Sequence, residues 1–324
     1  VIFDFDGTLG DTEVPAMEVA FWELAPYFPN VQAEDLTPQR MKEFIRQNAG
    51  KAFELMLNKV EKARAAVGLE TIEETRSKYA EDFDIIQVVT AERAGLGLKP
   101  LEMCREDHAT LLEKQRDETL EALKALAKAN NGVIKALNFL KISGFKYCVS
   151  TTSPKPRVPA CVETAGLSEF FPEDKIHSGQ SDFDPPRYKP LPDVYLKAAA
   201  AEGIEVDSCI AVEDSVSGVG SAANADIALI VGYVGGSHVQ LDLEDTQARE
   251  LLQGKKSRNG RGADIVIRDM EDLPAIVNSF LNLKLDAPEK AKAGAFDFSD
   301  IKPSMRDKFW EAEKTPADDD SNPR

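Results

Sequence analysis

Short apolar runs alternate with longer amphipathic segments through the second half of the chain. The runs lie near residues 145–149, 175–178, 208–212, 227–231 and 264–267, and segments with helical periodicity separate them. Strands that alternate with helices are typical of a parallel α/β sheet. The chain also begins with an apolar run, Val1 to Phe3, which we assign to a first strand of the same sheet.

A helical segment of roughly residues 13–131 separates this first strand from the rest of the sheet. It is rich in Glu, Lys, Ala and Leu, and its periodicity predicts helices at 39–46, 52–67, 73–84 and 107–129. We therefore expect an α/β core of residues 1–12 and 132–284, interrupted by an all-helical module of residues 13–131. The polar residues 285–324 form a C-terminal extension. Its aromatic residues indicate that part of it packs on the core, and its last residues are expected to be disordered.

Two carboxylates follow the first strand. Asp4 and Asp6 are two residues apart, and side chains two apart on a strand share a face. Gly7 then allows the backbone to turn sharply. Like charges this close repel unless a cation lies between them or one of them carries a proton. The pair predicts a Mg²⁺ site or a nucleophile beside an acid/base, and the alternative is an ordinary solvated turn.

Two later segments place polar groups just before helices. Thr151, Thr152 and Ser153 end the strand at 145–149, before a helix that we expect near Lys155. A hydroxyl and successive N–H groups in such a turn can cradle an anion, although Ser and Thr there also act as simple N-caps. Lys189 precedes a proline that we place in the first turn of the next helix. This lysine is either a solvated charge or a fixed cation for phosphate.

Two more acids, Glu213 and Asp214, end the apolar strand at 208–212. Acids at the end of a core strand are costly unless a cation compensates them. Together with Asp4 and Asp6 they would suit an octahedral Mg²⁺ that keeps some of its waters. The three histidines lie far apart with no ligand-like spacing, which argues against zinc.

Together these four segments resemble motifs I to IV of the haloacid dehalogenase-like (HAD) hydrolase superfamily. The spellings Asp-Gly-Thr-Leu…Asp-Thr-Glu, Lys-Pro-x-Pro-Asp and Glu-Asp-Ser-x-x-Gly resemble the branch that contains β-phosphoglucomutase and small sugar-phosphate phosphatases. The motifs occur in the expected order over roughly two thirds of the chain. The resemblance implies a Rossmann-like core and a C1 cap, which is an inserted helical lid that closes over the substrate.

The resemblance also implies catalytic roles. Asp4 would be the nucleophile that forms an aspartyl-phosphate, and Asp6 would be the general acid and then the general base. Lys189 would hold both the nucleophile and the phosphoryl oxygens. Mg²⁺ would be bound by Asp214, assisted by Glu213, together with Asp4 and the backbone carbonyl of Asp6.

Substrate contacts follow from the same resemblance. Thr151 would bind the phosphoryl group, helped by the N–H groups of Thr152 and Ser153, and Gly7 and Glu13 of the first motif are further candidates. In the cap, the loop Arg46-Gln47-Asn48-Ala49-Gly50-Lys51 resembles one whose basic residue contacts substrate. Lys51 is therefore our first candidate and Arg46 our second, and the alternative is a solvated helix end.

One departure from the family pattern bears on the reaction. A histidine usually follows Asp-Thr-Glu-x-x in the mutases, and Ala16 stands there in this chain. This favours a Mg²⁺-dependent phosphatase of a hexose or hexitol phosphate, such as mannitol 1-phosphate, over a sugar-phosphate mutase. Asp6, Glu213 and Asp214 argue against a 2-haloacid dehalogenase, because that reaction needs no metal. The four intact motifs argue against a non-catalytic scaffold, in which at least one motif would be lost.

Composition narrows the choice of partners. The net charge of −17 and the pI near 4.8 argue against nucleic acid and anionic membranes. We expect a small phosphorylated metabolite as the ligand, and a monomer or weak homodimer. The four scattered cysteines indicate a reducing, cytoplasmic compartment, although the chain begins inside its first strand and leaves room for targeting residues upstream. The basic, glycine-rich segment 254–262 is expected to be a flexible surface loop or an anion-binding one.

Overall fold

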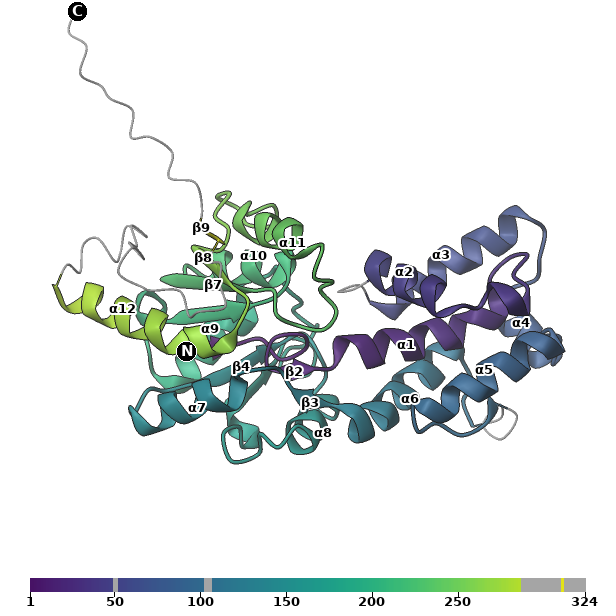
Figure 1. The fold of residues 1–324 in the computed structure, drawn as a ribbon, viewed down its shortest axis with the longest axis horizontal. Coiled ribbons are helices and arrows are strands. Elements are labelled where there is room, and N and C mark those ends of the chain that lie inside the picture. The colour runs from purple at the N-terminus through teal and green to yellow at the C-terminus, as the bar shows by residue number, and fades with distance from the viewer. Residues whose placement is uncertain (49–51, 102–106, 287–309, 312–324) are drawn as a thin grey trace, which may run out of the picture.

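The computed structural model describes residues 1–48, 52–101, 107–286 and 310–311. An elongated molecule results, with a sheet-based core at one end and a bundle of helices at the other (Figure 1). None of the helices in the described ranges is long and apolar enough to cross a bilayer.

A seven-stranded sheet forms the centre of the core, in the order β5-β4-β1-β6-β7-β8-β9. The first six of these strands run parallel, which confirms the predicted α/β class. Their bounds are β1 Ile2–Phe3, β4 Cys148–Thr151, β5 Ile176–Ser178, β6 Ile210–Glu213, β7 Leu229–Tyr233 and β8 Ile265–Ile267. A last strand, β9 (Trp310–Glu311), pairs antiparallel with β8 and was not predicted from the sequence.

Helices cover both faces of this sheet. Side chains alternate along β1, so that Phe3 belongs to the apolar cluster of one face and Ile2 to that of the other. The first face is covered by α7 (Val133–Ile142), α8 (Arg157–Thr164) and α12 (Leu273–Asp286). The second is covered by α9 (Asp193–Glu202), α10 (Val216–Asn224) and α11 (Glu244–Leu252). Polar groups of the core therefore collect at the ends of the strands, where neither layer covers them.

In the described part of residues 13–131, six α-helices build the inserted module, which we call the cap. They are α1 (Glu13–Leu24), α2 (Pro38–Asn48), α3 (Phe53–Ala66), α4 (Ile72–Ser77), α5 (Phe83–Gly95) and α6 (Leu111–Leu126). The cap has two apolar clusters of its own, and α1 contributes to both. In Figure 1, α1 leads out of the core and α6 leads back toward it.

Two of the predicted cap helices are wrong in their bounds. The helix expected at 73–84 is two helices, because α4 ends at Ser77 and α5 starts after Asp82. The Asp82 carboxylate accepts hydrogen bonds from the backbone N–H groups of Asp84 and Ile85, so a new N-cap begins there. The helix expected at 107–129 starts only after Thr110, which forms a capping box with Glu113.

A buried cluster of charges ties three of the cap helices together. Arg93 of α5 and Lys114 of α6 both contact the carboxylates of Glu23 and Glu118, at distances of 2.5 to 2.8 Å. All four side chains are buried, so two positive charges compensate two negative ones away from water.

The chain crosses between core and cap at a small antiparallel pair of strands. They are β2 (Gly10–Asp11) and β3 (Lys128–Ala129). Next to β3, the amide Nδ2 of Asn130 donates to the backbone oxygens of Gly7 and Thr8, both at 2.9 Å. The turn that follows β1 is therefore held by the same segment that brings the chain back from the cap.

Candidate active site

The first motif forms a tight turn rather than a longer strand. β1 ends at Phe3, so the prediction that Asp4 and Asp6 share one face of a strand is wrong. Gly7 has φ of 83°, and a Cβ there would lie 2.0 Å from Oδ2 of Asp214. Glycine is required at this position both by the backbone conformation and by the close approach of the carboxylate.

Lys189 connects three of the four motifs. Its Nζ donates to Asp4 Oδ1 at 2.6 Å, to Glu213 Oε1 at 2.5 Å and to the backbone oxygen of Ser150 at 2.8 Å. The side chain is only 3% exposed, so this lysine is a fixed internal cation and not a solvated one. The following proline does not lie in the first turn of a helix as expected, because α9 begins at Asp193.

Three buried carboxylates meet beside Lys189. Oxygen atoms of Asp4, Glu213 and Asp214 all lie within 4.8 Å of one another. Burial, together with the charges of Glu213 and Asp214, raises the pKa of Asp4 well above its usual range, although Lys189 opposes this. Oε2 of Glu213 is buried without a hydrogen-bond partner among the described residues. A group of oxygen ligands with excess negative charge and an unsatisfied oxygen fits a hard divalent cation.

Asp6 is not part of this carboxylate cluster. Oδ1 accepts hydrogen bonds from Thr12 Oγ1 at 2.6 Å and from Arg157 Nη2 at 2.7 Å, and Oδ2 accepts one from Ser153 Oγ at 2.6 Å. Although burial opposes it, the Arg157 charge, with these hydrogen bonds, lowers the pKa of Asp6. The expectation of four carboxylates around one ion is therefore wrong for the Asp6 side chain, which has its own cationic partner.

The turn after β4 lies between these two groups. Thr151 is buried, and its Oγ1 accepts a hydrogen bond from the backbone N–H of Ser153 at 3.0 Å. The Ser153 N–H is thus engaged within the turn, whereas the Thr151 hydroxyl keeps its proton for another acceptor. Thr152 and Ser153 are half-buried, and α8 begins at Arg157 rather than near Lys155.

Three residues around the site were missed by the sequence analysis. Besides Arg157, the Tyr195 hydroxyl donates to Glu213 Oε1 at 2.7 Å, and His238 Nε2 lies 3.2 Å from Asp214 Oδ2. Burial opposes protonation of His238, but Asp214 raises its pKa. Tyr195 follows the Lys-Pro-x-Pro-Asp motif by two residues. His238 and Arg157 lie outside all four motifs and are positioned by tertiary contacts.

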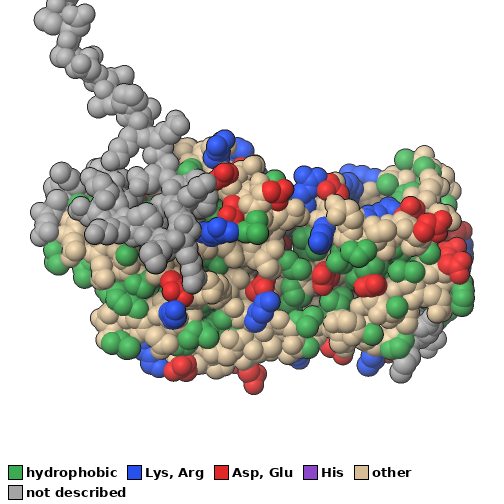
Figure 2. Space-filling view, viewed as in Figure 1, with side chains coloured by type: hydrophobic (Ala, Val, Ile, Leu, Met, Phe, Trp, Pro, Cys, Tyr) green, Lys and Arg blue, Asp and Glu red, His purple; other side chains and the backbone are tan. Residues whose placement is uncertain are grey.

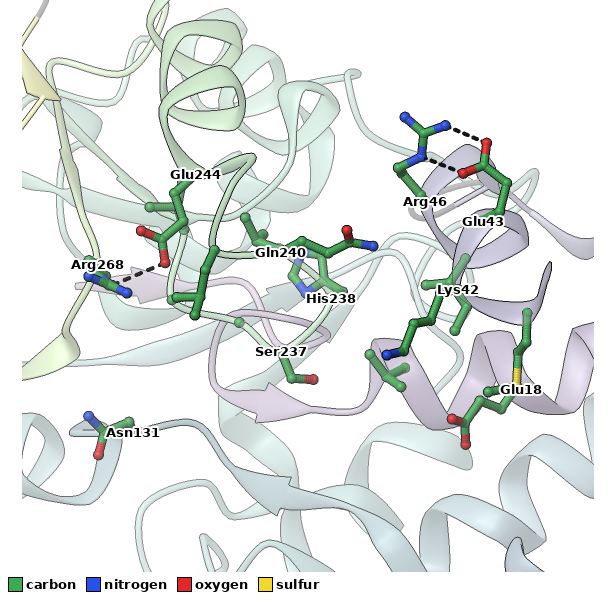
Figure 3. Close-up of a pocket in the computed structure, with 18 of the residues that line it drawn as sticks. Glu18, Lys42, Glu43, Arg46, Asn131, Ser237, His238, Gln240, Glu244 and Arg268 are labelled. Atoms are coloured by element: carbon green, nitrogen blue, oxygen red, sulfur yellow. Dashed lines mark hydrogen bonds and ion pairs between the residues drawn. The ribbon is translucent and has the colours of Figure 1, made fainter. Parts of the chain in front are cut away.

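A cavity of about 990 Å³ opens between the cap and the core next to this site. It is lined by α1 and α2 on one side and by residues 234–241 and 268–272 on the other. Figure 2 shows a notch in the outline where the two parts meet. In Figure 3, Lys42 reaches from α2 toward the loop that carries Ser237 and His238.

The residues expected to contact the substrate from the cap lie in different surroundings. Arg46 lines the cavity, but its guanidinium pairs with Glu43 of the same helix, and the Arg46 side chain is 49% exposed. Lys51 lies outside the described residues. Glu13 is the first residue of α1 and follows Thr12, which donates to Asp6. Lys42, which was not predicted from the sequence, lines the cavity and has no ion-pair or hydrogen-bond partner among the described residues.

The sequence of this chain is similar to those of known hydrolases. Residues 1–226 match a model of the haloacid dehalogenase-like hydrolases. A haloacid dehalogenase-like hydrolase domain-containing protein of Arabidopsis thaliana is 30% identical over 134 residues, which are 40% of this chain and 42% of that relative. A phosphorylated carbohydrates phosphatase of Thermotoga maritima is 26% identical over 48% of this chain and 70% of its own length. A 6-phosphogluconate phosphatase of Escherichia coli is 28% identical over 46% of this chain and 61% of its own.

Solved structures extend the similarity to the cap. A haloacid dehalogenase-like protein of Agrobacterium tumefaciens superposes with a TM-score of 0.59 at 25% identity, over 86% of this chain and 97% of that one. A putative β-phosphoglucomutase of Thermotoga maritima shares the fold, with a TM-score of 0.52 at 22% identity over 86% and 97% of the two chains. The chain spans less than two thirds of the Arabidopsis and Escherichia relatives. Its motifs, its sheet order and the matched family model nevertheless lead to one conclusion: the chain belongs to the haloacid dehalogenase-like hydrolases, with a helical cap inserted after the first strand.

Proposed function

We propose that this protein is a Mg²⁺-dependent phosphatase that hydrolyses a small phosphorylated sugar or polyol through an aspartyl-phosphate at Asp4. One observation carries the proposal. Lys189 bridges Asp4 and Glu213, and Asp214 offers an oxygen within 4.8 Å of both carboxylates. A carboxylate nucleophile, a fixed cation and a cluster of oxygen ligands are the groups that phosphoryl transfer requires.

In the first half of the reaction, Asp4 attacks phosphorus and the bond to the leaving oxygen breaks. Asp6 gives a proton to that oxygen, so that the alcohol leaves uncharged. The ion pair with Arg157 favours the ionised carboxylate, so Asp6 takes up this proton only after the anionic phosphoryl group has bound beside it and raised its pKa. Lys189 keeps Asp4 oriented and compensates charge on the phosphoryl oxygens, and the free hydroxyl proton of Thr151 is available to one of them. Thr152 and Ser153 shape the same turn.

In the second half, Asp6 removes a proton from a water molecule that attacks the aspartyl-phosphate. Phosphate leaves and Asp4 is regenerated. Asp4, Asp214, the assisting Glu213 and the backbone carbonyl of Asp6 would hold Mg²⁺. When bound there, Mg²⁺ would neutralise negative charge shared by the nucleophile and the phosphoryl group.

The substrate class rests on the relatives and on the cavity. Two relatives are phosphatases of phosphorylated carbohydrates and of 6-phosphogluconate. The cavity beside the site mixes charged and apolar side chains and is large enough for a hexose or hexitol phosphate, such as mannitol 1-phosphate. Glu13, Arg46, Lys51 and Gly7 are the sequence-based candidates on the substrate side, and Lys42 joins them from the structure.

A screen for phosphate release tests this function. Sugar, polyol and nucleotide monophosphates are incubated with the protein, with and without Mg²⁺. We expect release from hexose or hexitol phosphates only with Mg²⁺. Transfer of the phosphate within the sugar without release would instead establish a mutase, and no release from any ester would contradict the proposal.

Mg²⁺ should also stabilise the folded protein directly. A ligand that binds only the folded state at about 100 times its Kd adds about 2.7 kcal/mol to the free energy of unfolding. Thermal unfolding with EDTA and with saturating Mg²⁺ should show this shift. Asp214→Asn should remove most of it, and an equal shift in that variant would exclude Asp214 as a ligand.

Lys42→Met should weaken substrate binding. Because the Lys42 amine has no partner among the described residues and faces the cavity, its loss should raise KM about 10-fold with little change in kcat. Steady-state kinetics on the best substrate of the screen measures this. Lys59→Met, on the exposed surface of α3, is the matched control. Equal KM values for the Lys42 variant and the wild type would remove this lysine from the substrate site.

A further inference from the structure

We propose that Arg157 is a positioning residue for Asp6, which fixes the carboxylate of the acid/base for proton transfer. The proposal rests on the phosphatase function above and adds to it a residue outside the four motifs. Arg157 is the first residue of α8 and contacts Asp6 across the turn that carries Thr151 to Ser153.

Three donors from different parts of the fold hold the Asp6 carboxylate. Thr12 precedes the first cap helix, Ser153 lies in the turn after β4, and Arg157 opens a helix of the core. Hydroxyl groups rotate freely and can follow a moving acceptor. A guanidinium is planar and rigid, so Arg157 is the donor that defines the direction of the carboxylate.

The helix that carries Arg157 is packed against the sheet. In α8, Val158 and Cys161 have no exposed surface, and both belong to the apolar cluster on that face of the sheet. The base of the arginine side chain is therefore fixed relative to the sheet. Nη2 of Arg157 lies 2.7 Å from Oδ1 of Asp6, and the Arg157 side chain is only 22% exposed.

The contacts of Arg157 differ from those of the structural arginines in this chain. Arg64 donates to the backbone oxygens of Glu70 and Tyr27, and Arg261 donates to those of Ile227 and Ala228. Arg64 also donates to the Thr75 hydroxyl and Arg261 to the Asp264 carboxylate, so each of these arginines connects several partners at once.

Among the described residues, the carboxylate that the Arg157 guanidinium contacts is that of Asp6, and the Cys161 thiol of the same helix also lies beside this guanidinium. Its Nε is buried there without any acceptor. A largely covered guanidinium whose charged partner is one carboxylate, and whose Nε has no acceptor, is placed for that carboxylate and not for a network of backbone contacts.

The test compares two kinds of ester. Alkyl phosphates need a proton at the leaving oxygen, whereas p-nitrophenyl phosphate expels a stable phenolate without one. The constant kcat/KM covers the steps up to the aspartyl-phosphate, which include the transfer to the leaving group. It is measured with Mg²⁺ on p-nitrophenyl phosphate and on the best alkyl phosphate of the screen, for the wild type, Arg157→Met, Arg157→Lys and Lys155→Met.

For Arg157→Met we expect kcat/KM to fall about 100-fold on the alkyl ester and less than about 3-fold on p-nitrophenyl phosphate. Arg157→Lys keeps the charge without the planar fork, and should show a smaller loss of the same kind. Lys155→Met removes a nearby cation that pairs with Asp182 instead, and should leave both constants unchanged. In an Asp6→Asn background, Arg157→Met should cause no further loss on the alkyl ester.

Equal losses on both esters, a gain on the alkyl ester, or an additive loss in the double variant would each overturn the proposal. Activity on p-nitrophenyl phosphate shows that a variant is folded. If the Met variant is not recovered as a folded protein, the Lys variant decides by the same comparison. Failure of the wild type itself to hydrolyse any ester would count against the phosphatase function instead, so the two failures are distinguishable.

Discussion

Asp4→Asn should abolish turnover while leaving the protein folded. In the proposed mechanism Asp4 is the covalent nucleophile, so its loss removes the route through the aspartyl-phosphate. Comparable losses in other hydrolases reach about 10³-fold or more in kcat. Phosphate release under saturating substrate and Mg²⁺ measures the effect. Substantial Mg²⁺-dependent hydrolysis by this variant would remove Asp4 from its role.

The same variant has a second, opposite effect on stability. Burial and the neighbouring carboxylates raise the pKa of Asp4 in the folded protein, so its negative charge destabilises the fold at neutral pH when no metal is bound. Asparagine keeps an oxygen that can accept the Lys189 hydrogen bond but carries no charge. In EDTA at pH 7, we expect Asp4→Asn to have a Tm equal to or above that of the wild type. A large decrease would show that the loss of activity reflects misfolding.

Lys189→Met should destabilise the protein as well as inactivate it. Its Nζ lies 2.6 Å from Asp4 and 2.5 Å from Glu213, and both carboxylates are buried. Removing one member of a buried ion pair typically costs about 3–5 kcal/mol, because the remaining charge has no compensation. Urea unfolding in EDTA at pH 7 measures the loss.

The pH dependence of this variant has a defined sign. Without Lys189, burial keeps the pKa values of Asp4 and Glu213 raised in the folded state, and the hydrogen bond from Tyr195 to Glu213 opposes this only in part. Stability should therefore recover as the pH falls and these carboxylates take up protons. Lys197→Met, at a lysine 40% exposed and 3.9 Å from Asp182, is the control, with an expected change below about 0.5 kcal/mol. Equal stability losses in the Lys189 and Lys197 variants would contradict the conclusion that Lys189 compensates the buried charges of Asp4 and Glu213.

The strands and the motif residues at their ends could be predicted because their signals are local. The apolar run at 208–212 followed by Glu213 and Asp214 indicates both a core strand and the place where it stops. In parallel strands these ends lie at one edge of the sheet, so the convergence of Asp4, Lys189 and Asp214 could be anticipated.

Other contacts could not be read from the sequence because they depend on packing. Arg157 reaches Asp6 across 151 positions of sequence, and no local pattern distinguishes it from a solvated arginine at a helix start. His238 lies in a loop after β7 that has no motif. The two-residue β9 pairs with the edge of β8 only once the sheet exists.

The break between α4 and α5 is a different case. Asp82 stands directly before Phe83 and caps the new helix, so the local signal was present. It was outweighed by the helical periodicity that continues through residues 73–84. For the basic segment 254–262, the expectation of a flexible loop overlooked Arg261, whose guanidinium contacts two backbone oxygens and Asp264.

Chemical trapping of the phosphorylated residue tests the account most directly. The protein is mixed with its best substrate and Mg²⁺, quenched within the turnover time, and treated with borohydride, which reduces an acyl phosphate to an alcohol. Mass spectrometry of the N-terminal peptide should then find homoserine in place of Asp4, and none in the Asp4→Asn variant. Steady turnover with an unmodified Asp4, or with the reduced residue at another carboxylate, would contradict the assignment of the nucleophile.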